Sequence, residues 1–136
     1  MSVIHVTSAS RNDAEGKGNE AEAIFELEVI PQLCNPMNNM HGGAMALLAD
    51  MTTTMAGAPI ARQGWWEFGG VSRTLSVTYV RPALLGTTIV VTCVLRSRAV
   101  IQFIARDKVT GKLLALAEHG KNALVAQVHP EKTGRL

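Results

Sequence analysis

The sequence is short of the features that mark several protein classes. It has two cysteines, Cys34 and Cys93, in 136 residues, which does not fit a disulfide-rich scaffold, and their spacing does not fit a metal site. Because 13 basic and 11 acidic residues leave a net charge of only +2, with no block of like charge, no nucleic-acid-binding surface is indicated. Charged residues interrupt every long apolar stretch before the ~18 residues that a membrane span needs. We therefore expect no nucleic acid partner, membrane span, metal or cofactor.

The length and the first residues point to one domain in a reducing compartment. A chain of 136 residues can bury a substantial core but is too short for two ordinary domains. Residues 1–20 lack the basic segment and apolar core of a secretory signal. We expect the cytoplasm, with the mitochondrion as the alternative, and we expect the polar residues 128–136 to form a flexible tail.

Six segments have the pattern of β-strands. Val71–Val80 is the clearest, with residues 71, 73, 75, 77 and 79 predicted on one face and the Ser and Thr residues at 72, 74, 76 and 78 on the other. A polar loop is expected at Arg11–Asn19 and a hairpin turn at Val109–Gly111. The other five predicted strands are Val3–Ser8, Ala21–Ile30, Thr87–Leu95, Val100–Asp107 and Lys112–Val125.

One long helix is predicted between the second and third strands. From His41 to about Ala61, small and apolar residues recur at three- and four-residue steps, as they do on an amphipathic helix. The order strand, strand, helix, four strands predicts an α+β domain in which a curved antiparallel sheet packs around one helix.

The stretch NPMNNMHGGAMALLAD, residues 35–50, holds the densest set of candidate functional groups. Asp50 falls on a helix face that the periodicity places in the core, where a carboxylate needs partners and where burial would suit it to act as a general base or nucleophile. At the helix start, His41, Gly42 and Gly43 carry backbone N–H groups that can bind a developing oxyanion.

The two ends of this stretch cannot easily act on one carbonyl within one chain. Gly42 and Asp50 are eight residues apart, about 12 Å along a helix. A two-fold dimer, in which the helix start of one subunit meets the helix middle of the other, would bring them together.

A predicted loop after the helix is rich in aromatic residues. Residues 63–70 contain Trp65, Trp66 and Phe68, half of the aromatic side chains in the chain. They are interpreted either as a hydrophobic cap over the core or as a wall for an apolar ligand.

Three sequence stretches together resemble a known family. NPMNNMHGGAMALLAD, GGVSRTLSVTYVRPALLG and TGKLLALAEHGK are similar to the hotdog-fold acyl-CoA thioesterases, in particular the phenylacetate-pathway type and the thioesterase superfamily member 2 type. The resemblance extends from about Val3 to Val125. It implies a hotdog fold, hydrolysis of an acyl thioester of Coenzyme A or of a carrier protein, and a homodimer that pairs into a homotetramer.

The resemblance also implies catalytic roles for five residues. Asp50 matches the acidic residue that activates water or attacks the thioester. Gly42 matches the glycine whose N–H polarises the carbonyl, and His41 matches the histidine beside it. Asn35 matches an asparagine that positions the substrate or water, and Ser72 a residue that orients the water. In the family, Asn, His and Gly come from one subunit and Asp and Ser from its partner.

Basic residues are candidates for binding the phosphates of Coenzyme A. Arg96 and Arg98 lie at a strand end, and Lys121 matches a basic position in the last strand of the family. His119, in the same strand, is interpreted as structural. The substrate-binding candidates are Gly43, Thr54, Arg96, Arg98 and Lys121.

Simpler interpretations remain open for each residue taken alone. The glycines could serve close packing, Asp50 could pair with a threonine hydroxyl, Asn35 could be a turn residue, and the basic residues could be solvated charges. Two other functions are also open. One is lyase, dehydratase or cyclase chemistry on a polyketide-like intermediate, with Asp50 or His41 moving a proton. The other is a non-catalytic module that binds an acyl ligand.

Overall fold

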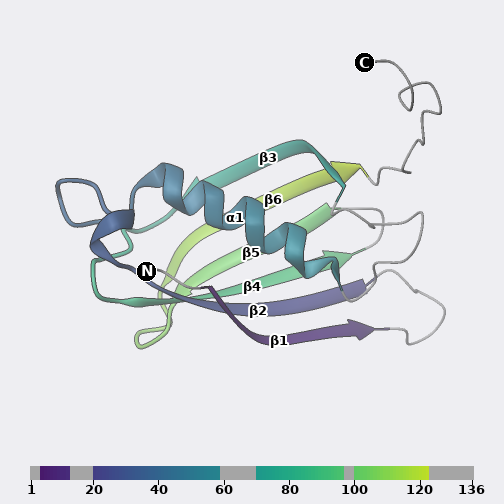
Figure 1. Ribbon diagram of the computed structural model, residues 1–136, viewed down its shortest axis with the longest axis horizontal. Helices are drawn as coiled ribbons and strands as arrows, with labels where there is room; N and C mark the ends of the chain where they lie inside the picture. Colours follow the sequence, from purple (N-terminus) through teal and green to yellow (C-terminus); the bar gives the residue numbers. More distant parts are fainter. Residues whose placement is uncertain (1–3, 13–19, 59–69, 97–99, 123–136) are drawn as a thin grey trace, which may run out of the picture.

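The computed structural model describes residues 4–12, 20–58, 70–96 and 100–122, which form a six-stranded antiparallel sheet and one long helix, α1 (Figure 1). The strand order is β1-β2-β4-β5-β6-β3, so β1 and β3 are the edges. The elements are β1 (His5–Asn12), β2 (Glu20–Glu28), the short 3₁₀ helix η2 (Pro31–Leu33), α1 (Gly42–Ala56), β3 (Val71–Tyr79), β4 (Thr88–Arg96), β5 (Val100–Asp107) and β6 (Leu113–Asn122).

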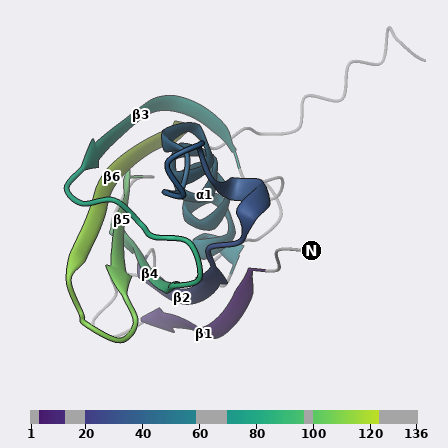
Figure 2. The same cartoon turned by 90° about the vertical axis from the view of Figure 1, so that its left-hand side faces the viewer.

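The sheet curves around α1, as the end-on view in Figure 2 shows. The side chains that face the helix are buried at alternate positions of β2, β4, β5 and β6. Phe25 and Phe103 fill this core, while the buried alanines Ala23, Ala105 and Ala115 let the helix approach the sheet. The predicted α+β architecture, a curved antiparallel sheet around one helix, is confirmed.

The helix is shorter than predicted. It ends at Ala56 rather than near Ala61, and Gly57 is its C-cap. Pro59 follows closely, and a proline disfavours helical backbone in the residue before it. Consecutive threonines inside the helix satisfy their hydroxyls by donating to carbonyl oxygens four residues earlier; Thr52 donates to the Leu48 oxygen at 2.7 Å.

The strands agree with the prediction apart from their ends. β1 runs to Asn12, so Arg11 and Asn12 are strand rather than loop. The hairpin turn after β5 is confirmed, with Gly111 at a φ of 70°. Trp65, Trp66 and Phe68 lie outside the described residues, as does the tail at 128–136.

The strict alternation predicted for β3 is wrong at its start, because the strand contains a bulge. Ser72 pairs with Lys121 and Thr74 with Gly120, which leaves Arg73 as an extra residue. Ser72 therefore faces α1, whereas Thr74 faces away and lies over Gly120. A Cβ atom on Gly120 would lie 2.5 Å from the Thr74 Oγ1 atom, so the glycine gives the bulge its room.

Candidate functional site

The start of α1 presents a backbone donor, the Gly42 N–H, that has no acceptor among the described residues. His41 is the N-cap, and its Nδ1 atom accepts a hydrogen bond from the Gly43 N–H at 2.9 Å. The Gly42 N–H has no hydrogen-bond acceptor within the described part of the chain. Of the two glycine N–H groups predicted to bind an oxyanion, the Gly43 group is thus occupied and the Gly42 group is available.

The fold of one chain does not require a glycine at position 42. Its φ is not positive, and an added Cβ atom would meet only Tyr79, with the nearest atom at an ordinary contact distance of 3.5 Å. The missing side chain therefore leaves space for something other than this chain. A bare backbone with a free N–H suits the close approach of a carbonyl group.

Asn35 organises the loop before the helix and also lines a cavity at the helix start. Its Oδ1 atom accepts from the N–H groups of Met37 and Asn39, at 3.0 and 3.2 Å. The turn role proposed for Asn35 is thus present, and it leaves the side-chain NH₂ group free to donate elsewhere. Asn35 and Gly42 line one cavity of about 360 Å³ together with Met45, Tyr79 and Pro82.

Tyr79 is a residue of this region that the sequence did not single out. It comes from the end of β3, and its hydroxyl donates to the Gly42 carbonyl oxygen at 2.6 Å. Tyr79 therefore fixes the peptide that follows the free N–H. The signal was present in the sequence, since the strand ends in Tyr-x-x-Pro, but the role depends on β3 crossing the helix start.

Asp50 lies in the middle of α1 and is less buried than predicted. Its side chain is 46% exposed, so the helix face that carries it is not part of the core of one chain. The carboxylate Oδ1 atom lies 3.7 Å from the Nε2 atom of His119 on β6. The Asp50 carboxylate is thus partly exposed and also lies next to the buried His119.

His119 connects the helix to the edge strand β3. It is fully buried, its Nδ1 atom lies 2.6 Å from the Thr53 Oγ1 atom, and its Nε2 atom lies 2.7 Å from the Ser72 Oγ atom. Burial lowers the pKa of His119 first of all, the charge of Lys121 lowers it further, and Asp50 opposes both. These influences favour the neutral ring.

The hydrogen bonds assign one tautomer to the neutral ring. We assign the only hydroxyl proton of Thr53 to the Ala49 carbonyl oxygen at 2.6 Å, which leaves the Thr53 oxygen to accept from the His119 Nδ1–H. The Nε2 atom then has no proton and accepts from the Ser72 hydroxyl. Ser72 keeps its oxygen lone pairs available, close to Asp50.

The bulge of β3 makes this arrangement possible. With regular alternation Ser72 would face away from α1, together with Thr74, Ser76 and Thr78. Ser72 was a predicted site residue, whereas His119 was interpreted as structural. The two residues are 47 positions apart and meet only through the pairing of β3 with β6.

Of the three basic candidates, Lys121 is the one whose side chain the structure describes. Lys121 is 4% exposed, and its Nζ atom donates to the Thr54 Oγ1 atom at 2.6 Å. Thr54 in turn donates to the Asp50 carbonyl oxygen. Arg96 is the last residue of β4, and Arg98 lies outside the described residues.

The candidate groups thus form two sets at different levels of α1. Gly42 and Asn35 line the cavity at the helix start, and Asp50, Ser72 and His119 meet at its middle. Gly42 and Asp50 are eight positions apart, which corresponds to about 12 Å along the helix. The fold of one chain does not bring the N–H donor and the carboxylate together.

Comparisons with known proteins identify the family. The family model described as the thioesterase superfamily matches residues 37–108. Human acyl-coenzyme A thioesterase 13 is 36% identical over 111 residues, which cover 74% of this chain and 72% of the human protein. The chain belongs to the thioesterase superfamily. It is accordingly a thioester hydrolase.

Solved structures agree with this assignment. Thioesterase superfamily member 2 from Mus musculus is 30% identical, with a TM-score of 0.70 over 87% of this chain and 80% of that chain. The PaaI protein of the phenylacetic acid degradation operon of E. coli is 20% identical, with a TM-score of 0.69 over 89% and 79% of the two chains. The hotdog fold predicted from the sequence is confirmed.

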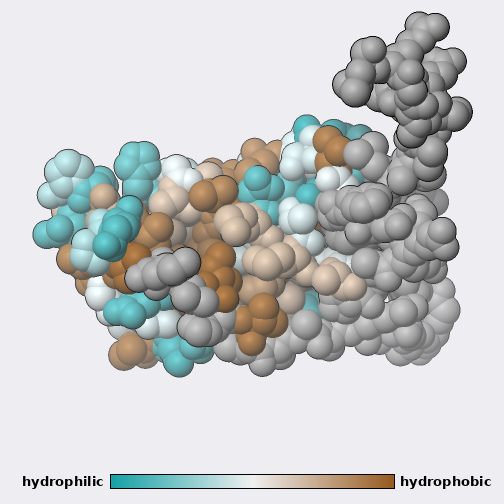
Figure 3. Space-filling model, in the orientation of Figure 1, coloured by the Kyte–Doolittle hydropathy of each residue, from teal (hydrophilic) through white to brown (hydrophobic). Residues whose placement is uncertain are grey.

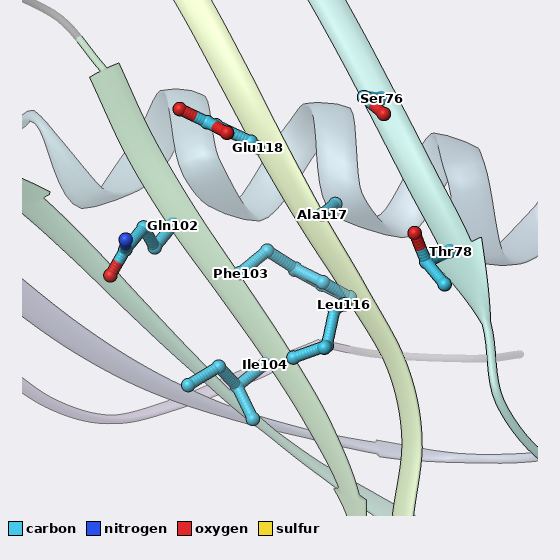
Figure 4. Close-up of a pocket in the computed structure, with 8 residues that line it drawn as sticks. All are labelled: Ser76, Thr78, Gln102, Phe103, Ile104, Leu116, Ala117 and Glu118. Carbon is cyan, nitrogen blue, oxygen red and sulfur yellow. The ribbon is translucent and has the colours of Figure 1, made fainter.

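A second hollow of this thioesterase lies on the sheet face opposite α1. Figure 4 shows that Ser76, Thr78, Gln102 and Glu118 surround it, with the helix behind the sheet. Its volume is about 350 Å³, similar to that of the cavity at the helix start. None of the candidate catalytic residues lines it.

The Cys93 thiol of the thioesterase lies fully buried in the core. Burial raises the pKa of the Cys93 thiol to about 12, so it is not a thiolate nucleophile at neutral pH. Across residues 4–12, 20–58, 70–96 and 100–122, no three His, Cys, Asp or Glu side chains are grouped as metal ligands. Over the same ranges, no helix has the length and apolar character needed to cross a membrane.

Proposed function

We propose that this thioesterase hydrolyses acyl-CoA thioesters with water activated by Asp50, while the Gly42 N–H binds the oxyanion. The observation that carries the proposal is the unpaired Gly42 N–H in the cavity that it shares with Asn35. The name of the human relative, acyl-coenzyme A thioesterase 13, supports Coenzyme A as the carrier.

The cavity at the helix start can hold the thioester carbonyl. The Gly42 N–H and the Asn35 side-chain NH₂ would both donate to the carbonyl oxygen, whose negative charge grows as the carbon becomes tetrahedral. Each such donor contributes about 10²–10³-fold in enzymes that use one. His41 contributes by engaging the Gly43 N–H and so fixing the first turn.

The helix middle can prepare the water. The Asp50 carboxylate would take a proton from the water as its oxygen bonds to the carbonyl carbon, and the Ser72 oxygen would accept the other water hydrogen. When the tetrahedral intermediate collapses, the carbon–sulfur bond breaks and the proton on Asp50 passes to the thiolate. The products are a carboxylic acid and a free thiol.

A second copy of the chain would supply the missing half of each site. Apolar side chains surround Asp50 on the surface: Leu47, Met51 and Met55 on α1 are 57%, 45% and 38% exposed, and Leu75 on β3 is 39% exposed. Figure 3 shows hydrophobic side chains gathered along this side of the molecule. A homodimer that covers this surface places the Gly42 of one subunit against the Asp50 of the other.

Thiol release from short, long and aromatic acyl-CoAs tests the chemistry. Wild type should release thiol, and Asp50→Asn should lower kcat by about 10²–10⁴-fold while leaving the fold intact, because the amide cannot take a proton. Wild-type turnover in Asp50→Asn would refute the role of Asp50. Absence of release from every acyl-CoA would favour a carrier-protein substrate or non-hydrolytic chemistry.

Mixing two inactive variants tests the shared site. Asn35→Asp keeps the oxygen that accepts from Met37 and Asn39 but loses the NH₂ donors, and Asp50→Asn loses the base. A heterodimer of the two variants has one intact and one doubly altered site. Refolding them together should restore about a quarter of wild-type activity, since half of the dimers are mixed. No recovery would show that each site belongs to one chain.

A further inference from the structure

Lys121 is a lysine in the interior of the protein, which is rare because burying an ammonium group is costly. It lies on β6, two residues after His119, and is 4% exposed. Its Nζ atom donates to Thr54 on the helix at 2.6 Å. Such a position does not suit the contact with Coenzyme A phosphates that the resemblance implied, since those phosphates remain solvated at a pocket mouth.

Lys121 instead belongs to a group of three ionisable side chains beneath one turn of α1. Lys121 and Asp50 are linked through Thr54, which accepts from the lysine and donates to the Asp50 carbonyl oxygen at 2.8 Å. Asp50 and His119 are 3.7 Å apart. The group therefore joins the proposed base to the histidine that holds Ser72.

The elements packed around His119 provide one negative and one positive neighbour. On the helix side the charged group is Asp50, and on β6 it is Lys121. β3 contributes the uncharged Ser72, and β5 places Ile101 opposite His119. Asp50 favours protonation of the imidazole ring and Lys121 opposes it.

The protonation state of His119 decides what its Nε2 atom does. In the neutral tautomer Nε2 accepts the Ser72 proton, and Asp50 is not hydrogen-bonded to the ring. A protonated ring would carry an Nε2–H that donates to Ser72 or Asp50. Donation to Ser72 would turn the Ser72 hydroxyl away from the ring. Donation to Asp50 would occupy a lone pair of the carboxylate that acts as the base.

We propose that Lys121 is a positioning residue that keeps His119 neutral, and thereby holds the Ser72 hydroxyl toward the ring and leaves the Asp50 carboxylate available for the water. The proposal rests on the proposed function, because it gives Asp50 and Ser72 their roles in hydrolysis. Lys121 need not touch the substrate.

A matched pair of variants separates the charge of Lys121 from its hydrogen bond. Lys121→Gln can still donate to Thr54 but has no charge, whereas Lys121→Arg keeps the charge. The profile of kcat/KM against pH should fall on its acid side as His119 becomes protonated. In Lys121→Gln this acid limb should move to higher pH, because the repulsion that opposed protonation of His119 is lost.

Lys121→Arg should keep the acid limb at its wild-type position, even if its overall rate is lower. If Lys121 had only a structural role, the rate of each variant would fall by a factor that is the same at every pH, and the acid limb would not move. An acid limb that stays in place in Lys121→Gln would therefore overturn the proposal.

NMR titration of the His119 ring gives a readout that does not require turnover. Its resonance is identified by its absence from His119→Gln, and its midpoint should lie at higher pH in Lys121→Gln than in wild type. Unchanged midpoints would reject the positioning role even in an active enzyme. A shifted midpoint in a protein that releases no thiol would refute the proposed function and leave the link between Lys121 and His119 standing. If Lys121→Gln does not fold, Lys121→Met removes the charge together with the hydrogen bond to Thr54, and its His119 midpoint should also lie at higher pH than in wild type.

Discussion

The two ends of the candidate site are built in different ways. At the start of α1, the functional groups are a backbone N–H and an amide side chain, and neighbours within a few residues hold them in place. His41 occupies the Gly43 N–H, and Asn35 caps its own loop. At the middle of α1, side chains of Asp50, Ser72 and His119 meet from three elements.

This difference predicts how each end responds to change. The helix start depends on short-range hydrogen bonds that re-form whenever the loop and the first turn form. The helix middle depends on the register of β3 against β6 and on the bulge at Arg73, so a change on the outer face of the sheet can reach it. Apart from removal of the base Asp50 itself, changes should therefore separate stability from activity at the helix start and move the two together at the helix middle.

The largest separation is expected for Gly42→Ala. The added Cβ atom meets only Tyr79 at 3.5 Å, so the chain has room for it, and alanine favours helix over glycine by up to about 1 kcal/mol. The same methyl group would stand where the carbonyl must approach. We expect kcat/KM to fall by about 10²-fold or more, with an unchanged or higher Tm.

Gly43→Ala is the matched control for that variant. Its Cβ atom would lie 3.2 Å from the His41 Nδ1 atom, which disturbs the cap but does not block the Gly42 N–H. Its loss in kcat/KM should be clearly smaller than that of Gly42→Ala. Equal losses in the two variants would show that the first turn, rather than the free N–H, is what matters.

A combined effect on stability and activity is expected for Gly120→Ala. The Cβ atom would lie 2.5 Å from the Thr74 Oγ1 atom, so the bulge must shift, at a cost of about 1–3 kcal/mol of folding free energy. Moving Ser72 away from His119 removes a hydrogen bond worth about 1–1.5 kcal/mol, which corresponds to about tenfold in kcat/KM. Chemical denaturation and initial rates measure the two effects.

Thr74→Ala in the Gly120→Ala background tests the cause. It removes the colliding Oγ1 atom from the outer face of the sheet and touches neither Ser72 nor His119. Both stability and kcat/KM should recover in part. Recovery of stability alone would show that the bulge does not control the position of Ser72.

The same contrast explains what the sequence could predict. Alternation and periodicity located the strands and the helix, and local motifs located Asn35, Gly42 and Asp50, because those signals lie within short stretches. The contacts of His119 could not be predicted from the sequence, because its partners Thr53 and Ser72 are 66 and 47 positions away. A bulge leaves no mark in the alternating pattern apart from Gly120, and that glycine lies on the other strand. The exposure of Asp50 was missed because periodicity does not tell a core face from a face that another chain can cover.

The smallest effect is expected for Tyr79→Phe. At this residue the helix start, like the helix middle, depends on a contact between distant parts of the chain. Tyr79 is a long-range support of the helix start, since its hydroxyl donates to the Gly42 carbonyl oxygen from β3, next to the hydrogen bond from the Met40 N–H to the Ala83 carbonyl oxygen. Phenylalanine keeps the ring that walls the cavity and removes one exposed hydrogen bond, so Tm should stay within error of wild type. Loss of about 1 kcal/mol in holding the Gly42 peptide should lower kcat/KM about fivefold, with the larger part in kcat. Wild-type kcat in Tyr79→Phe would mean that His41 and the loop fix the helix start without this contact. The helix start would then depend on local hydrogen bonds, and the helix middle on contacts between distant residues.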